Sequence, residues 1–191
     1  MKNIKTFMDF TWPFSYVGFS ILDRIRKEKP EVEYVWYPYQ LDKDIPEEGK
    51  DMFGRFEKGY ERFSGLGKEY DLVFKDSKKV FNTERAHKAA LFARDNDKLY
   101  EFAKEVFKTV WEKGENIGTM ETINNIGLKV GLNIPEMNRC ISSGAYDEEM
   151  YEAKRLSSVY EVESVPTFII DDKKNVTNLK PYSEFIKDFE N

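Results

Sequence analysis

The sequence contains one cysteine, Cys140, and one histidine, His87, among its 191 residues. A single thiol cannot form an internal disulfide and is typical of a reducing compartment, so we expect a cytoplasmic protein. One cysteine and one histidine also leave too few of the preferred ligands for a clustered transition-metal site. We therefore predict that no metal is bound.

Long apolar runs and an excess of one charge are absent as well. No stretch approaches the ~20 apolar residues of a membrane-spanning helix, and the first eight residues are too short and too interrupted for a secretory signal, so we expect none. The 30 basic and 35 acidic residues are mixed along the chain, which favours neither a nucleic acid nor a membrane as partner. The 40% of hydrophobic residues suffice for a substantial globular core.

The first 44 residues follow a strand–helix–strand pattern. Weak alternation predicts a strand at residues 3–8, and a β-branched and aromatic run predicts another at residues 32–37. Between them, apolar residues recur every three or four positions from Phe14 to Ile25, behind a proline suited to the first helical turn. Such a βαβ unit places its two strands parallel in one sheet.

Helical patterns occupy residues 45–157, and strand character then returns. Six helices are predicted there, beginning near residues 57, 83, 99, 119, 135 and 147, with Asn82 or Thr83, Thr119 and Asp147 as caps. A strand at 165–170, a turn at 171–175, a short extended run at 176–179 and a helix at 182–189 follow.

The combined pattern predicts an α/β protein with a thioredoxin-like fold and a large helical insertion. The thioredoxin-like domain is discontinuous and comprises residues 1–44 and 158–191. Residues 45–157 form the inserted helical domain.

One segment carries a family motif at the junction of the first strand and helix. It reads Asp9-Phe-Thr-Trp12-Pro13-Phe14-Ser15-Tyr16-Val-Gly18. The segment resembles the Asp-x-x-Cys-Pro-Trp-Cys-Tyr-x-Gly active site of the DsbA-like thioredoxin-domain family, in particular its FrnE-type branch. Further matches follow in the same order along the chain: Tyr37-Pro38-Tyr39-Gln40-Leu41, Ile45-Pro46-Glu47-Glu48-Gly49, Asn82-Thr83-x-x-Ala86-His87, Gly114-Glu-x-Ile117 and Ser164-Val165-Pro166-Thr167-Phe168.

Both cysteines of the family dithiol are replaced in this chain. Trp12 occupies the position of the reactive thiolate, which a helix N-terminus would otherwise stabilise. Ser15 occupies the position of the resolving thiol, and a hydroxyl cannot take part in disulfide exchange. We therefore predict a redox-silent protein of an oxidoreductase family, and whether any catalysis remains is left open.

The resemblance implies that a binding groove persists without the thiols. In the family, a peptide or glutathione pairs with the backbone of the residue before a cis-proline, and Val165-Pro166 matches that loop. The ligand would be a peptide or a small-molecule thiol, with glutathione as the one cofactor considered. The predicted substrate-binding residues are Trp12, Pro13, Phe14, Tyr39, Asn82, His87, Val165 and Pro166. An aromatic wall of Trp12, Phe14, Tyr39 and Phe168 would cover the groove.

Structural roles compete with each of these functional ones. Trp12 could equally be a core or interface aromatic residue that fills the former active site. Ser15 could be a hydroxyl satisfied within the first helical turn, and Asn82 could be a helix cap. His87 within a helix and Cys140 beside an isoleucine also suit a protein core. The alternative function is a glutathione-dependent isomerase or transferase with Ser15 as catalytic residue, like the kappa-class glutathione transferases and hydroxychromene-carboxylate isomerases. Those relatives carry their serine at the first cysteine position, which here is Trp12. The oligomeric state stays open.

Overall fold

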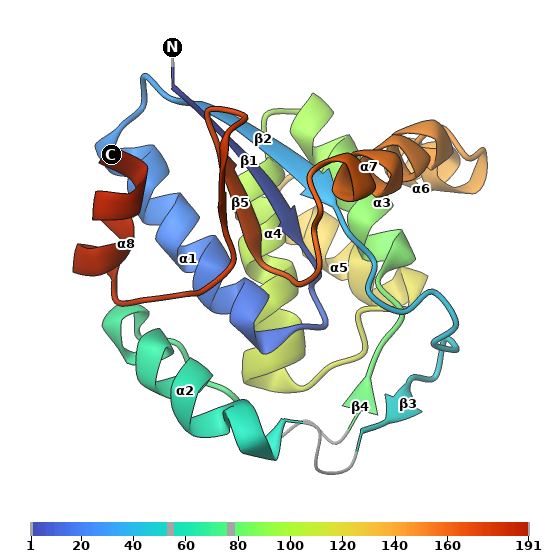
Figure 1. The fold of residues 1–191 in the computed structure, drawn as a ribbon. Coiled ribbons are helices and arrows are strands. Elements are labelled where there is room, and N and C mark those ends of the chain that lie inside the picture. The colour runs from blue at the N-terminus through green and yellow to red at the C-terminus, as the bar shows by residue number, and fades with distance from the viewer. Residues whose placement is uncertain (1, 53–55, 76–78, 191) are drawn as a thin grey trace.

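A four-stranded mixed sheet in the order β2-β1-β5-β6 runs through the computed structural model, which describes residues 2–52, 56–75 and 79–190 (Figure 1). The elements in chain order are β1 (Asn3–Met8), α1 (Pro13–Glu28), β2 (Glu33–Pro38), β3 (Lys50–Asp51), α2 (Glu57–Gly67), a 3-10 turn (Lys68–Tyr70), β4 (Lys79–Val80), α3 (Glu84–Asp95), α4 (Leu99–Lys108), a π-helical turn (Thr109–Lys113), α5 (Met120–Lys129), α6 (Ile134–Ser142), α7 (Asp147–Val159), β5 (Thr167–Ile170), β6 (Lys174–Val176) and α8 (Tyr182–Glu190).

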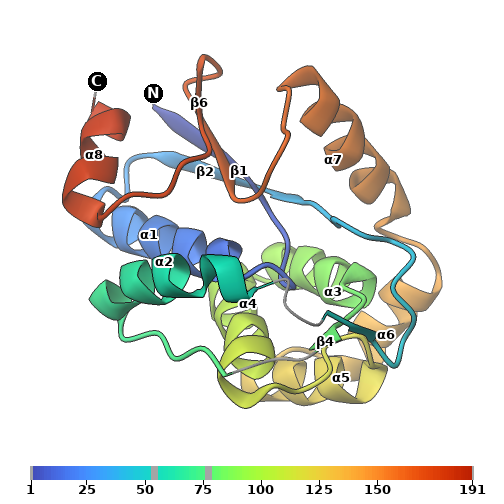
Figure 2. The ribbon, with the colours of Figure 1, turned by 60° about the horizontal axis from the view of Figure 1, so that its bottom comes forward.

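The sheet confirms the predicted βαβ unit and the thioredoxin-like fold. Strand β1 pairs in parallel with β2 and antiparallel with β5, and β6 pairs antiparallel with β5. The N-terminal and C-terminal segments of the chain therefore form one sheet. Helices α1 to α6 lie below this sheet in Figure 2, whereas α7 lies at its other side. This pairing brings the junction of β1 and α1 next to the segment that enters β5.

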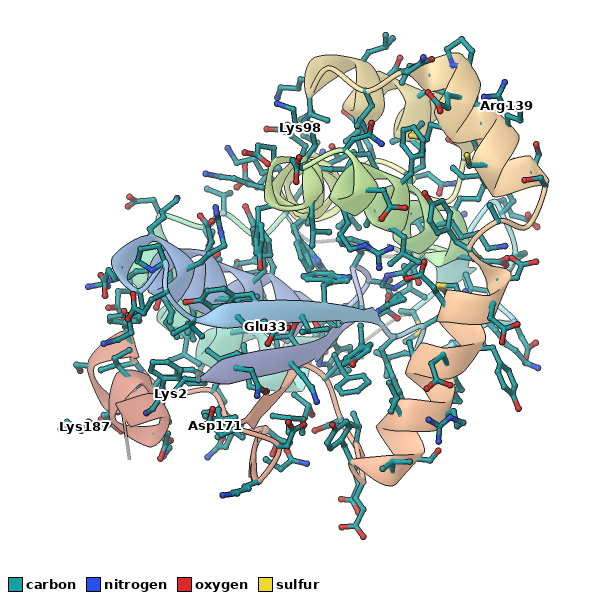
Figure 3. All side chains as sticks on the ribbon, turned by 90° about the horizontal axis from the view of Figure 1, so that it is seen from above. Lys2, Glu33, Lys98, Arg139, Asp171 and Lys187 are labelled. Atoms are coloured by element: carbon teal, nitrogen blue, oxygen red, sulfur yellow. The ribbon has the colours of Figure 1, made fainter. Side chains whose placement is uncertain are left out.

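An aromatic core fills the space between α1, the sheet and the helical layer. The Phe107 ring of α4 lies 4.9 Å from Phe10 and 5.3 Å from Phe19, and the ring of Trp36 in β2 lies 5.8 Å from Phe10. Figure 3 shows side chains filling this space, whereas the labelled Lys98 and Arg139 lie at the outer edge of the helices. Burial of this apolar surface joins the helical region to the sheet.

Most predicted boundaries hold within two or three residues, and the exceptions have local causes. The prediction that Asp147 caps a helix is wrong. Asp147 is the first residue of α7, and its carboxylate pairs with Lys88 instead. The predicted turn at 171–175 and extended run at 176–179 are displaced, because β6 already begins at Lys174. The small antiparallel pair of β3 and β4 was not predicted, since two residues per strand carry no periodicity.

Helix caps follow the sequence in two other places. Thr119 caps α5 as predicted, its side chain accepting the N–H of Thr122. At α3 the side chain of Asn82, rather than that of Thr83, accepts the N–H of Glu84.

Among the described residues, we find no helix with the length and apolar character needed to cross a membrane.

Gly18 is the point at which α1 approaches the loop before β5 most closely. A Cβ atom added to Gly18 would lie 2.6 Å from Cγ of Pro166, whereas one added to Gly65 in α2 would meet nothing within 4 Å. We expect Gly18→Ala to lower the free energy of unfolding by about 1–2 kcal/mol, because overpacking outweighs the better helix propensity of alanine. Gly65→Ala should leave stability unchanged or raise it. Urea unfolding of both variants checks this, and equal effects at the two positions would contradict it.

Candidate functional site

Trp12 occupies the cap position of α1, at the end of the first loop. Its backbone is extended, with φ −113° and ψ 120°, and Pro13 follows as the first helical residue. The indole is half-buried, with ring centroids 5.7 Å from Phe56 and 6.3 Å from Phe14. The residue that replaces the reactive cysteine is therefore an aromatic side chain that packs partly on its neighbours and partly faces solvent.

Ser15 points into the protein rather than toward a ligand. The residue is fully buried, and its Oγ accepts the backbone N–H of Asp9 at 3.3 Å. Its own N–H donates to the carbonyl of Trp12 at 2.9 Å. In this conformation the hydroxyl that was considered as a catalytic group has a structural role at the first turn of α1.

A buried pair of Asp9 and His87 lies behind the former active site. Neither side chain is exposed, and His87 Nε2 lies 3.3 Å from Asp9 Oδ1. The other oxygen of Asp9 accepts the N–H of Leu41 at 2.8 Å. Because His87 Nδ1 has no partner among the described residues, the ring hydrogen belongs on Nε2, donated to the carboxylate. His87 is thus out of reach of a ligand here.

The role of Asp9 went beyond the sequence-based prediction, which named it only as the first letter of the motif. A signal was available: an aspartate directly after a buried strand must find hydrogen-bond donors, because an unpaired buried carboxylate is strongly unfavourable. The position of the donors on α3 and after β2 could not be read from the sequence.

The Val165–Pro166 peptide bond is cis, and this segment lies beside Trp12. Val165 belongs to an apolar cluster with Phe7 and Ile169, against which Trp12 and Tyr39 pack as half-buried residues. Neither the N–H nor the C=O of Val165 bonds to another described residue. Val165 is only 4% exposed, so a ligand reaches this backbone by displacing part of the covering side chains.

Of the residues of the predicted aromatic wall, Trp12 and Tyr39 pack on the Val165 cluster. Phe168 does not belong to it: the residue is fully buried and packs on Phe185, with ring centroids 4.9 Å apart. Successive strand residues point to opposite faces of a sheet, and Ile169, not Phe168, is on the face of Val165. On that same face, Tyr37 stacks on Phe7 at 4.9 Å, and burial raises the pKa of its phenol.

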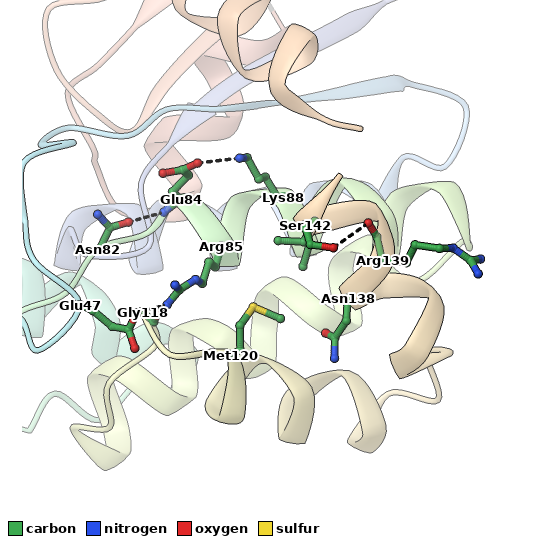
Figure 4. Close-up of a pocket in the computed structure, with 11 residues that line it drawn as sticks. Glu47, Asn82, Glu84, Arg85, Lys88, Gly118, Met120, Asn138, Arg139 and Ser142 are labelled. Atoms are coloured by element: carbon green, nitrogen blue, oxygen red, sulfur yellow. Dashed lines mark hydrogen bonds and ion pairs between the residues drawn. The ribbon is translucent and has the colours of Figure 1, made fainter. Parts of the chain in front are cut away.

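Asn82 lies in another part of the site region. Its Nδ2 donates to the carbonyl of Ile45 at 2.8 Å, and its Oδ1 also accepts from Gln40. It lines a cavity of about 650 Å³ together with Arg85 and Asn138, shown in Figure 4, where the Arg139 side chain points away from the other labelled residues. The side chain of Asn82 thus bonds to Ile45 and Gln40 and not to Trp12 or Val165.

Cys140 lies in the helical layer, away from Val165 and the residues that pack on it. Cys140 is half-buried in α6, which packs against α3 and α5. In the described ranges, no group of three or more histidine, cysteine, aspartate or glutamate residues is placed to hold a metal ion.

Comparison with known proteins identifies the family of this chain. Residues 3–187 match the model of the DSBA-like thioredoxin domain. The chain belongs to the DSBA-like thioredoxin domain family. This is a family of thiol oxidoreductases, and the chain matches it over nearly its whole length. The uncharacterized protein YwbO of Bacillus subtilis (strain 168) is 27% identical over 180 residues, which cover 89% of this chain and 87% of YwbO.

Two solved structures illustrate the shared fold of the DSBA-like family. The probable DsbA oxidoreductase SCO1869 from Streptomyces coelicolor has a TM-score of 0.87 at 15% identity, covering 99% of this chain and 88% of that one. A 2-hydroxychromene-2-carboxylate isomerase has a TM-score of 0.73 at 16% identity, covering 97% and 91%. At these identities the likeness is one of fold.

The buried Asp9 carboxylate yields a stability prediction. Asp9→Ala removes the acceptor of Leu41 N–H and of His87, so we expect the free energy of unfolding to fall by about 3 kcal/mol or more. Asp44→Ala is the matched control, because that exposed carboxylate has no partner among the described residues, and should change stability by less than ~0.5 kcal/mol. Urea unfolding measures both, and a loss below ~1 kcal/mol for Asp9→Ala would contradict the assigned role.

Proposed function

We propose that this protein is a redox-silent member of the DSBA-like family that binds an extended peptide beside the former active site. The observation that carries the proposal is the pair of replacements, Trp12 and Ser15, within an otherwise intact junction of β1 and α1. The one sulfur that could serve instead, Cys140, belongs to α6 in the helical layer. Thiol–disulfide exchange by a dithiol needs two neighbouring thiols, and the chain holds one.

Two features support peptide binding. The unpaired N–H and C=O of Val165 are the groups that an added extended strand would bond. Beside them, Trp12 and Tyr39 offer partly exposed aromatic surface, and aromatic residues dominate the energetics of many protein interfaces. Backbone pairing would supply affinity for any extended chain, and the aromatic surface would add contacts to its side chains.

The alternative, glutathione-dependent catalysis with Ser15, has less support. Ser15 is fully buried and its Oγ already accepts a backbone N–H, so a reaction there would require α1 to rearrange. The isomerase among the structural neighbours shares the fold at 16% identity. We therefore assign no reaction to Ser15, and we treat a small thiol as a competitor to be tested for the same surface.

The loss of redox activity can be tested with insulin. We expect the protein not to accelerate reduction of insulin by dithiothreitol above the uncatalysed rate, because no dithiol can form. The measurement is turbidity from the precipitating insulin chains, for the unmodified protein and for Cys140→Ser. Acceleration that persists in Cys140→Ser would overturn the redox-silent assignment.

Peptide binding can be tested by selection from a randomised phage-displayed library. We expect enriched peptides to bind Trp12→Ala at least about tenfold more weakly than the unmodified protein, because truncation removes about 1.5 kcal/mol or more of apolar contact. Leu128→Ala is the control, since Leu128 is 63% exposed on α5 and should leave affinity unchanged. No enrichment, or equal binding by Trp12→Ala, would contradict the proposal. Displacement by reduced glutathione would show that a small thiol shares the surface.

A further inference from the structure

Two cavities open along α7, next to the segment that leads to Pro166. One, of about 650 Å³, is lined by residues 38–44 and by Met150 and Tyr151 of α7. The other, of about 460 Å³, is lined by Ser157, Ser158 and residues 161–163. Tyr39 and Lys154 line both, so the cavities are two halves of one groove, which we call the α7 groove.

Tyr39 and Lys154 form the boundary between the two halves. The ammonium of Lys154 lies over the Tyr39 ring, 5.2 Å from its centroid. A cation at this distance is attracted by the ring face, but only weakly where solvent reaches it. Tyr39 also packs on the Val165 cluster, so the same ring connects the α7 groove to the proposed peptide site.

The groove carries exposed apolar side chains. Tyr151 is 70% exposed and Leu41 is 38% exposed, and Met150 beside them is half-buried. These three residues line one cavity and come from two separate segments of the chain. Apolar surface of this kind, placed in a concave site and continuous with a binding site, favours contact with another apolar side chain.

Unpaired negative charge lies at both ends of the groove. At one end is Asp44, and at the other are Glu161 and Glu163; their carboxylates make no hydrogen bond or ion pair with the residues that the structure describes. Lys43 and Lys154 are the counterbalancing cations, and Lys154 is held at Tyr39.

Lys88 and Asp42, which also line the larger cavity, are already paired. The Lys88 ammonium lies 2.6 Å from carboxylate oxygens of both Glu84 and Asp147. Burial alone would lower its pKa, but these hydrogen bonds outweigh it and raise the pKa. Asp42 lies 3.8 Å from the ammonium of Lys50. Among the described residues that line the groove, the groups without an ion-pair partner are therefore three carboxylates and two ammonium groups, and one of those, Lys154, lies over the Tyr39 ring. The groove thus offers a ligand a small excess of negative charge.

We propose that the α7 groove binds the continuation of the peptide that is held at Val165, and that it selects a segment with apolar and basic side chains. This inference rests on the proposed function and names its ligand class. Apolar side chains of the peptide would contact Leu41, Met150 and Tyr151. Its lysine or arginine side chains would lie near Asp44 at one end and near Glu161 and Glu163 at the other.

The test compares two fluorescein-labelled peptides, one of repeated Leu-Lys-Thr units and one of repeated Leu-Glu-Thr units, by fluorescence anisotropy. We expect the unmodified protein to bind the lysine peptide at least about tenfold more tightly, and added salt to reduce this ratio. Glu161→Gln/Glu163→Gln should lower the ratio at least about threefold, since each exposed ion pair contributes only modestly to affinity. Tyr151→Ala should weaken binding of the lysine peptide without changing how that binding depends on salt.

Matched controls separate local contacts from general effects. Glu121→Gln/Glu136→Gln makes the same change in net charge on the exposed surface of α5 and α6, and it should keep the ratio. Val159→Ala removes a 60% exposed apolar side chain at the end of α7 and should keep the affinity.

The outcomes distinguish the inference from the function on which it rests. Equal binding of the two peptides would overturn the α7 groove as a selective site. Equal changes of the affinity ratio in Glu161→Gln/Glu163→Gln and in Glu121→Gln/Glu136→Gln would overturn it too. The proposed function would stand in that case if selected peptides still lose affinity in Trp12→Ala. Failure of both peptides to bind overturns the inference, and a dimer that buries Tyr151 would overturn it as well.

Discussion

The buried carboxylate of Asp9 joins two parts of the molecule that are distant in sequence. It accepts the N–H of Leu41 in the segment after β2 and it contacts His87 in α3, while the backbone N–H of Asp9 donates to Ser15 Oγ in α1. A buried carboxylate without these partners would be strongly unfavourable, so the three segments are held together at one point. Trp12 and Tyr39 owe their positions to this arrangement, and none of it involves sulfur.

Replacement of the dithiol is therefore a local change in a preserved scaffold. Pro13 still begins α1 and Gly18 still allows the helix to approach Pro166, while an indole packs at the position of the reactive thiol. A tryptophan adds apolar contact area where a cysteine would offer a nucleophile. The scaffold retains its backbone geometry at this junction and gains an aromatic surface, and the proposed peptide binding is argued from these two features.

The sequence predicted elements whose signal is local and missed those that depend on distant partners. Residues 3–8 and the helix behind Pro13 follow from periodicity and appear as β1 and α1. Phe168 was placed in the groove because the family motif runs through it, but strand alternation turns it to the opposite face. The burial of Ser15, the acceptor role of Asp9 and the pairing of Asp147 with Lys88 each depend on a partner at least six residues away, which periodicity does not report.

The wall of the α7 groove is fixed to the sheet by a polar cluster at its far end. Tyr160, next after α7, accepts a hydrogen bond from Lys5 of β1 at 2.8 Å and donates one to Asp172 at 2.6 Å. These contacts tie the end of α7 to β1 and to the turn between β5 and β6. Because the chain then runs directly to Val165, the spacing between groove and peptide site is set by the sheet itself. A ligand that spans both would meet a groove and a proposed peptide site at a fixed spacing, although it must still displace part of the side chains that cover Val165.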